Sequence, residues 1–259
     1  MKRFIFMTAI LLGLLWWFGL PLGKDSPSKQ DKPYSFNSTN SSSYQPWSNS
    51  FEKVHRMVYL REATAYQLKK QDIVPLDNIS PSLQQAVLTM EDRKFYSHSG
   101  FDLEGILRAS LVNLQKGEVE EGASTITQQL AKNLFLSQDR SWSRKGEELA
   151  IALMLEKEFS KEEIFTLYLN RIYFGSNAYG IKEAAQTYFG KDPATLTLAQ
   201  SAMLAGLPQA PSLYSPHVDF ELAQKRKETV LQALLQQGLI TPKQAREAKE
   251  EVIEIRPFP

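Results

Sequence analysis

The clearest pattern in the chain is an uninterrupted apolar run near its N-terminus. Residues 4–22 contain no charged side chain, and Lys2 and Arg3 precede them. About 20 apolar residues, each rising about 1.5 Å, match the hydrocarbon thickness of a bilayer. Because positive flanks stay on the cytoplasmic side, the run predicts a single-pass anchor with a cytoplasmic tail of residues 1–3. A cleaved signal peptide is the alternative, but the run ends without the small-residue cleavage pattern of such peptides.

A polar segment follows the apolar run. Residues 23–50 are largely Ser, Asn, Gln, Pro and Tyr with almost no aliphatic side chains. Such a segment buries too little apolar surface to offset the entropy of ordering, so it predicts a flexible tether. From residue 51 onward apolar residues recur at helical spacing, which predicts a globular domain over residues 51–245 and a C-terminal tail over residues 246–259.

The globular part has the pattern of a series of helices. Ser80 and Pro81 are typical of an N-cap and a first helical residue. Weak strand signals occur only around Met57–Leu60, so the predicted fold class is mainly α. Apolar spacing and end signals predict helices through Leu83–Met90, Leu103–Leu114, Ile126–Leu134, Leu149–Phe159, Ile164–Tyr168, Ala178–Tyr188, Leu196–Ala205 and Phe220–Gln237, and a short one from Thr241-Pro242.

The composition of the chain excludes several classes of function. The 30 Lys and Arg residues nearly balance the 29 Asp and Glu residues, for a net charge of +1. No strong positive field is present, and no nucleic-acid partner is expected. The absence of cysteine excludes disulfides, thiolate metal sites and cysteine nucleophiles.

The first stretch with candidate chemistry begins at the end of an apolar helix. Glu91 and Asp92 follow that helix directly, before Phe95 and His98. A partly shielded carboxylate has a raised pKa, which suits a general base. The alternative is a solvated helix end whose acids are neutralised by the basic residues that follow. A single histidine such as His98 is more often structural than catalytic.

The second stretch opens with small and hydroxyl residues, including Ser124 and Thr125. The free N–H groups and the positive dipole end of a helix starting there favour an anion. Gln129, Lys132 and Asn133 are spaced to share one helix face. This predicts a face suited to a phosphate or a sugar, although a capped surface helix with polar side chains would have the same pattern.

The third stretch carries Arg144, Lys145 and Glu148. Arg144 and Glu148 are four residues apart, which fits either a surface ion pair or a cation and an acid in one pocket. Arg140, in the connection before this helix, is a further candidate phosphate contact.

Together and in this order, the stretches resemble the glycosyltransferase domain of the penicillin-binding proteins, the glycosyltransferase 51 family. The chain looks most like the monofunctional membrane-bound form, so no transpeptidase domain is expected. The resemblance covers roughly Val54 to Leu239. Its motifs are Glu91-Asp92-x-x-Phe95 with His98 and Gly100, Gly122-x-Ser124-Thr125-Ile126-x-Gln128-Gln129 with Lys132-Asn133, Arg144-Lys145-x-x-Glu148, and Glu163-Ile164 with Tyr168-Leu169-Asn170 and Tyr173-Phe174-Gly175.

The resemblance implies a lysozyme-like helical fold with a small membrane-proximal lobe, on the outer, periplasmic side of a bacterial cytoplasmic membrane. The implied substrates are lipid II and the growing lipid-linked glycan strand. Glu91 would be the general base of an inverting transfer that releases undecaprenyl pyrophosphate. Glu148 would orient the cations near the leaving group or hold a divalent metal, Mg²⁺ or Mn²⁺. Substrate and pyrophosphate contacts are implied for Lys132, Arg140, Arg144, Lys145, Ser124, Thr125, Gln128, Gln129, Asn133, Asp92, Phe95 and His98.

The resemblance also implies a membrane contact beyond the anchor. Leu103, Ile106, Leu107 and Leu111, with Phe101 nearby, are similar to the family's hydrophobic segment that dips into the bilayer. A plain core helix is the alternative interpretation, because an apolar face serves both purposes. Other proteins of cell-wall synthesis or division are further candidate partners.

Two other functions stay open at this point. A lytic transglycosylase or muramidase-like enzyme also uses a glutamate in a helical cleft, but it has no need of a cationic pyrophosphate site. An inactive scaffold for cell-wall assembly would need neither Glu91 nor Glu148, so the presence of both acids favours an enzyme.

Overall fold

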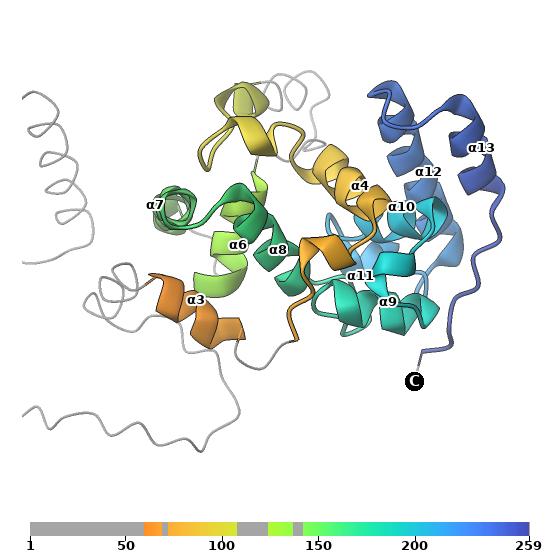
Figure 1. Cartoon of the computed structure of the whole chain (residues 1–259), viewed down its shortest axis with the longest axis horizontal. Helices are drawn as coiled ribbons and strands as arrows, with labels where there is room; N and C mark the ends of the chain where they lie inside the picture. The colour runs from red at the N-terminus through yellow and green to blue at the C-terminus, as the bar shows by residue number, and fades with distance from the viewer. Residues whose placement is uncertain (1–59, 69–71, 108–123, 137–141, 259) are drawn as a thin grey trace, which may run out of the picture. The chain divides into compact units, whose positions relative to one another are not determined.

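The computed structural model describes residues 60–68, 72–107, 124–136 and 142–258 (Figure 1). The predicted tail, anchor and tether (residues 1–50) lie outside the described residues. The chain divides into two units, Met1–Tyr59 and Leu60–Pro259, and the described residues all belong to the second. Within that described part, no helix is both long enough and apolar enough to span a bilayer.

The described residues are mainly helical, as predicted. The one bridge among them pairs Tyr173 with Tyr179. Residues 57–59 of the segment with weak strand signals are not described, and its last residue, Leu60, begins a helix. The elements are α3 (Leu60–Leu68), η1 (Leu76–Asn78), α4 (Pro81–Glu91), η2 (Phe95–Ser97), α6 (Ile126–Phe135), α7 (Trp142–Glu158), α8 (Lys161–Arg171), α9 (Ile181–Phe189), η3 (Pro193–Thr195), α10 (Leu198–Gly206), α11 (Pro211–Tyr214), α12 (Phe220–Gln236) and α13 (Pro242–Glu250).

Four of the described helices begin with the same capping box. A Ser or Thr side chain accepts the N–H three residues on, and the Gln or Glu at that position accepts the N–H of the capping residue. The boxes open α6 at Thr125, α8 at Ser160, α10 at Thr197 and α13 at Thr241. These local signals explain why helix starts were predictable from the sequence.

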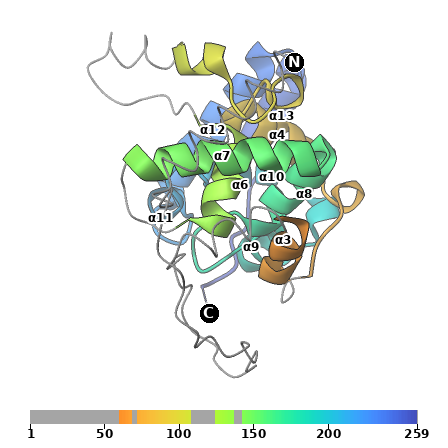
Figure 2. The ribbon, with the colours of Figure 1, turned by 90° about the vertical axis from the view of Figure 1, so that its left-hand side faces the viewer.

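Helix α10 forms the centre of one half of the core. Its residues 199–206 are all buried, and it packs against both α4 and α12. Four of its nine residues are Ala or Gly, so neighbouring backbones approach closely. In the other half α6 packs against α7 and α8 (Figure 2). Packing against α10 therefore fixes the position of α4, and the last residue of α4 is Glu91.

The folded domain continues past residue 245, where the sequence predicted the start of a C-terminal tail. The capping box at Thr241 starts α13, which continues to Glu250. Lys227 of α12 is buried and donates to the carbonyl oxygens of Ala248 and Lys249, which satisfies the end of that helix. Residues assigned by prediction to a tail thus pack on the domain.

The turn before α9 requires glycine. Gly180 has φ 84°, and a Cβ added there would lie 2.4 Å from the carbonyl oxygen of Asn170. Gly180→Ala is therefore expected to lower the free energy of unfolding by about 3 kcal/mol, from backbone strain plus the clash. Urea unfolding measures the change.

Gly238 provides the matched control for this prediction. It also has positive φ (69°), but a Cβ there meets nothing within 4 Å. Gly238→Ala is expected to cost only about 1 kcal/mol, because only the backbone preference changes. Equal losses in the two variants would show that the contact with Asn170 is unimportant.

Candidate active site

The carboxylate of Glu91 lies where three helices meet. Its Oε2 accepts a hydrogen bond from Gln129 Nε2 of α6 at 2.8 Å. The hydroxyl of Tyr168, fully buried on α8, donates to Gln129 Oε1 at 3.2 Å. Because the amide oxygen accepts from Tyr168, the amide nitrogen is directed at Glu91. The side chain of Glu91 is thus held in one orientation by α6 and α8.

The surroundings of Glu91 favour its protonation more than water does. Burial raises its pKa, while the hydrogen bond from Gln129 and the positive charges of Arg226 and Lys132 act in the opposite direction. Burial also raises the pKa of Tyr168 well above its ordinary value. Tyr168 therefore keeps its proton and stays a donor to Gln129. A shielded carboxylate with a raised pKa has the properties of a general base.

The neighbouring acid, Asp92, is buried and has a different environment. Its Oδ2 accepts the backbone N–H of Ile126 at 3.0 Å and lies 2.9 Å from His98 Nε2. The N–H of Gly100 donates to His98 Nδ1 at 3.2 Å, so the ring carries its proton on Nε2 and donates to Asp92. Asp92 therefore connects the turn after α4 to the start of α6.

The start of α6 differs from the expectation of a substrate anion site. Asp92 already accepts the N–H of Ile126, and the Thr125 hydroxyl accepts the N–H of Gln128 at 3.2 Å. The Thr125 hydroxyl also donates to the Gly100 carbonyl at 2.8 Å. The anion at this helix end is the Asp92 side chain, because a helix start favours any nearby carboxylate.

Phe95 packs against α8 just after the end of α4. Its side chain is buried, its ring lies 5.8 Å from that of Phe165, and the Lys161 ammonium lies 4.4 Å from its centre. Of the predicted site residues, Asp92, Phe95, Thr125 and Gln128 are buried in the structure, and His98 is partly buried. Their contact with substrate stays a prediction.

The predicted cations lie on α6 and α7, which pack against each other. Lys145 donates to Ser124 Oγ at 3.0 Å and forms an ion pair with the buried carboxylate of Glu148. Lys132 is exposed in the last turn of α6, and Asn133 beside it is partly buried. Arg144 is partly buried at the start of α7. Arg140 lies outside the described residues.

Two groups near Glu91 were not predicted as functional residues. Tyr168 belongs to one of the motifs of the resemblance but was given no role, and Arg226 lies on α12, more than 130 positions along the chain from Glu91. The segment around Arg226 is rich in Lys, Arg and Glu, a pattern that looks like an ordinary solvated helix face. Sequence periodicity carries no signal that would have singled it out.

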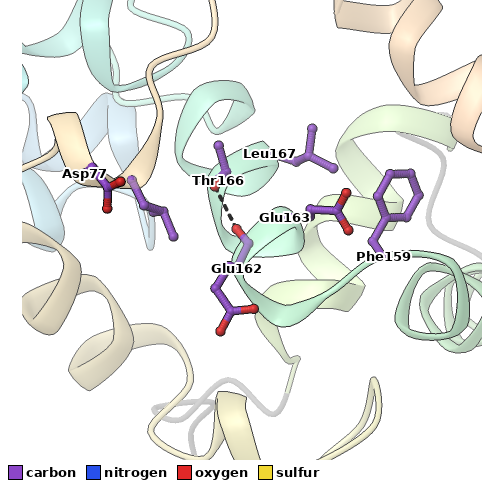
Figure 3. A pocket seen from close by; sticks show the side chains of 7 residues that line it. Asp77, Phe159, Glu162, Glu163, Thr166 and Leu167 are labelled. Atoms are coloured by element: carbon purple, nitrogen blue, oxygen red, sulfur yellow. Dashed lines mark hydrogen bonds between the residues drawn. The ribbon is translucent and has the colours of Figure 1, made fainter.

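A separate pocket of about 390 Å³ lies along the exposed face of α8 (Figure 3). Its walls combine apolar and acidic side chains, with the Thr166 hydroxyl donating to the carbonyl oxygen of Glu162. None of the predicted site residues lines this pocket, so the candidate active site is the one around Glu91. The lining residues are Leu76, Asp77, Phe159, Glu162, Glu163, Thr166 and Leu167.

Comparison with known families shows to which family the chain belongs. A family model described as transglycosylase matches residues 58–235. The chain therefore belongs to the transglycosylase family, the glycosyltransferase 51 family that its motifs resemble.

Individual relatives are penicillin-binding proteins. The chain is 45% identical over 193 residues to penicillin-binding protein 1A of Neisseria flavescens, covering 74% of the chain and 24% of that protein. It is 43% identical over 183 residues to penicillin-binding protein 4 of Bacillus subtilis, covering 71% of the chain and 29% of that protein. The chain thus spans about a quarter of the length of these relatives.

A solved structure also matches. The crystal structure of penicillin-binding protein 1A from Haemophilus influenzae aligns with 73% of the chain and 18% of that protein, at 26% identity and a TM-score of 0.45.

Proposed function

We propose that the chain is a peptidoglycan glycosyltransferase that polymerises lipid II into glycan strands and releases undecaprenyl pyrophosphate. The observation that supports this most directly is the Glu91 carboxylate, held by Gln129 and shielded enough to have a raised pKa. Membership of the transglycosylase family supports the class of reaction.

In the proposed reaction Glu91 accepts the proton of the acceptor sugar 4-hydroxyl. The oxygen attacks the anomeric carbon of the lipid-linked donor as the carbon–oxygen bond to pyrophosphate breaks, and the anomeric configuration inverts. Because Gln129 donates to Oε2 of Glu91, the carboxylate is already oriented before substrate binds. Such orientation lowers the barrier by avoiding rearrangement at the moment of proton transfer.

The leaving pyrophosphate gains negative charge and requires fixed positive charge nearby. Lys132 on α6 and the Arg144–Lys145 pair on α7 would provide it, since these two helices pack together. Lys145 is held in place by Glu148 and Ser124, so its ammonium is positioned without substrate. Asn133 and the Ser124 hydroxyl would contribute hydrogen bonds to the donor.

Glu148 could hold a divalent cation only if oxygens of the bound substrate supplied further ligands. Glu148 is one buried carboxylate, and the described residues contain no group of three His, Cys, Asp or Glu side chains suited to a metal. Mg²⁺ commonly binds one or two carboxylates plus substrate phosphates. Mg²⁺ or Mn²⁺ would therefore be held by Glu148 and pyrophosphate oxygens, where it would neutralise charge on the leaving group.

The helical residues 103–107 support the proposed membrane contact. Phe101, Leu103 and Leu107 are 40%, 60% and 58% exposed, which is unusual for large apolar side chains at neighbouring positions. A lipid-linked substrate is met at the bilayer surface, and this face would lie against it. Leu111, also predicted for this face, lies outside the described residues.

The test of the proposed function is a product assay. The purified full chain in detergent is incubated with labelled lipid II and Mg²⁺, products are resolved by length on a gel, and mature murein is incubated in parallel. A ladder of long strands with intact murein is expected. Release of fragments from murein without polymer would instead assign a glycan-cleaving enzyme, and no change in either substrate would favour the scaffold.

The raised pKa of Glu91 predicts the pH dependence of polymerisation. Glu91 acts as an anion, so activity should fall as pH decreases through its pKa, with a midpoint above the ordinary glutamate value of 4.5. The measurement is kcat/KM between about pH 4 and pH 8, where the acid limb reports the free enzyme. A midpoint at or below 4.5 would show that the carboxylate is not shielded in solution.

A further inference from the structure

The pocket along the exposed face of α8 has no role in the proposed reaction. Its volume of about 390 Å³ lies within the range of about 300–1,000 Å³ that is common for ligand-binding pockets. Figure 3 shows Asp77 of η1 and Phe159, which lies between α7 and α8, on opposite sides of the first turns of α8. Two segments more than 80 positions apart in the chain therefore build one cavity.

The lining of the pocket has an apolar part and an acidic part, and it contains no basic residue. Leu76 and Leu167 are only partly buried, so each keeps apolar surface open to the pocket. Asp77 and Glu162 are exposed acids on the same lining. A ligand that fits must carry positive charge beside apolar groups. Lys and Arg side chains have this character, since an aliphatic stem ends in a charged group.

The pocket lining already binds one cation from the chain itself. Nη1 of Arg61, on α3, lies 3.2 Å from Oε1 of Glu163, and its Nη2 donates to the carbonyl oxygen of Glu158. The guanidinium carbon lies 4.5 Å from the centre of the Phe159 ring. A carboxylate, a carbonyl oxygen and an aromatic face together favour a guanidinium. Since Glu163 and Phe159 both line the pocket, its chemistry suits a basic side chain.

The other two acids of the pocket have no such partner. The carboxylates of Glu162 and Asp77 form no ion pair or hydrogen bond with any residue that the structure describes. An acid in the first turn of a helix is stabilised by the helix dipole, which accounts for Glu162 on α8. The dipole does not account for Asp77, because η1 has only three residues. Two negative charges are thus left for a cation from outside the described chain.

We propose that this pocket is a docking site for a basic segment of a partner protein. The segment inserts a Lys or Arg side chain toward Glu162 and Asp77, and a neighbouring apolar side chain against the two leucines. A metal ion would gain nothing from the leucines, and the described residues contain no group of three acidic, His or Cys side chains suited to a metal. The inference does not depend on the proposed function, because no predicted site residue lines the pocket.

The test uses the purified full chain in a neutral detergent and two peptides labelled with a fluorophore at the N-terminus. One is Leu-Arg-Ala-Leu-Lys-amide, and the other has Glu in place of its Arg and Lys. Fluorescence anisotropy, with micelles alone as the blank, should show saturable binding of the basic peptide below about 1 mM and no binding of the acidic one. The affinity should fall as salt is raised, because exposed charges are screened.

Paired variants locate the charge effect. Glu162→Gln combined with Asp77→Asn should weaken binding about three- to tenfold, as expected for two partly exposed ion pairs. The matched control combines Glu221→Gln with Glu250→Gln, which removes two exposed acids from α12 and α13 and should leave the affinity unchanged. Circular dichroism verifies folding. Should the first double variant fail to fold, Glu162→Lys alone replaces it and should weaken binding at least as much.

A cross-link identifies the binding site directly. The basic peptide is made with benzoylphenylalanine in place of its second Leu, irradiated with the chain, and the product is mapped by mass spectrometry. Cross-links are expected at residues 76–77 and 159–167, which contain the lining of the pocket. Cross-links only at other residues would place the peptide elsewhere and overturn the inference.

Other outcomes decide between this inference and its alternatives. The absence of saturable binding, or equal affinity in the pocket variant and its matched control, overturns the docking site. Displacement of the bound peptide by an equal concentration of spermidine would assign the pocket to small free cations instead of a protein segment. Because the binding assay contains no lipid II, a chain that makes no polymer but binds the basic peptide keeps this inference and loses only the proposed function.

Discussion

Glu91→Gln is expected to lower the rate of lipid II polymerisation by at least about 100-fold, the range typical of losing a positioned general base. Glutamine has nearly the same shape, and its Oε1 still accepts the hydrogen bond from Gln129, so the fold should persist. It cannot accept a proton from the acceptor hydroxyl. The measurement is the initial rate of lipid II consumption by the purified variant, with circular dichroism to verify folding.

Glu158→Gln is the matched control, since Glu158 is an exposed glutamate on α7. It should retain the wild-type rate. If Glu91→Gln kept more than a tenth of the activity, Glu91 would not be the group that removes the proton, and another acid would have to be sought.

Asp92→Ala is expected to be the most destabilising change near the site. It would leave two donors without an acceptor, the buried N–H of Ile126 and the partly buried Nε2–H of His98. Each unsatisfied buried donor costs about 1–3 kcal/mol, so we expect a loss of about 4 kcal/mol. For a domain of this size that lowers Tm by roughly 10 °C in a thermal melt.

Two comparisons separate this effect from a general loss of charge. Asp92→Asn should destabilise less than Asp92→Ala, because its one amide oxygen still accepts one of the two hydrogen bonds. Asp72→Ala removes an exposed acid paired with Lys182 and should leave Tm near the wild-type value. Equal melting temperatures for Asp92→Ala and wild type would show that the contact between the turn and α6 does not support the fold.

Helix positions in this chain were largely predictable because the signals are local. The expected helix over Phe220–Gln237 is observed at Phe220–Gln236, and Gly238 follows it with positive φ. The helix expected through Ile164–Tyr168 is α8, which a capping box at Ser160 opens. Each of these depends on residues three or four apart, which interact in the isolated segment as they do in the protein.

The buried face of α7 was harder to predict. Leu149 and Leu153 mark this helix in the sequence, yet Leu153 is exposed, whereas Ile151 and Leu155 are fully buried with the carboxylate of Glu148. A buried acid within a helix face disturbs the apolar periodicity on which the prediction relies. Only the packing of α7 on α6 determines which side turns inward.

The division of roles within the site depends on contacts between distant segments. The motifs identify Glu91 and Asp92 as important, but two adjacent acids look alike in a sequence. Asp92 has a structural contact that Glu91 lacks, because the start of α6, more than 30 positions later, directs an N–H at it. The charge of Arg226 acts on the pKa of Glu91 only because α12 packs on α4. Such pairings follow from the fold and have no local pattern.

The exposed apolar face around Phe101, Leu103 and Leu107 has a practical consequence for purification and kinetics. Apolar surface of this kind drives self-association in plain buffer, and it belongs to the globular domain itself. A shortened protein lacking residues 1–59 should therefore still require detergent to remain dispersed. Micelles would then compete with lipid substrate for the same face, so rate constants for different variants are comparable only at one fixed micelle concentration.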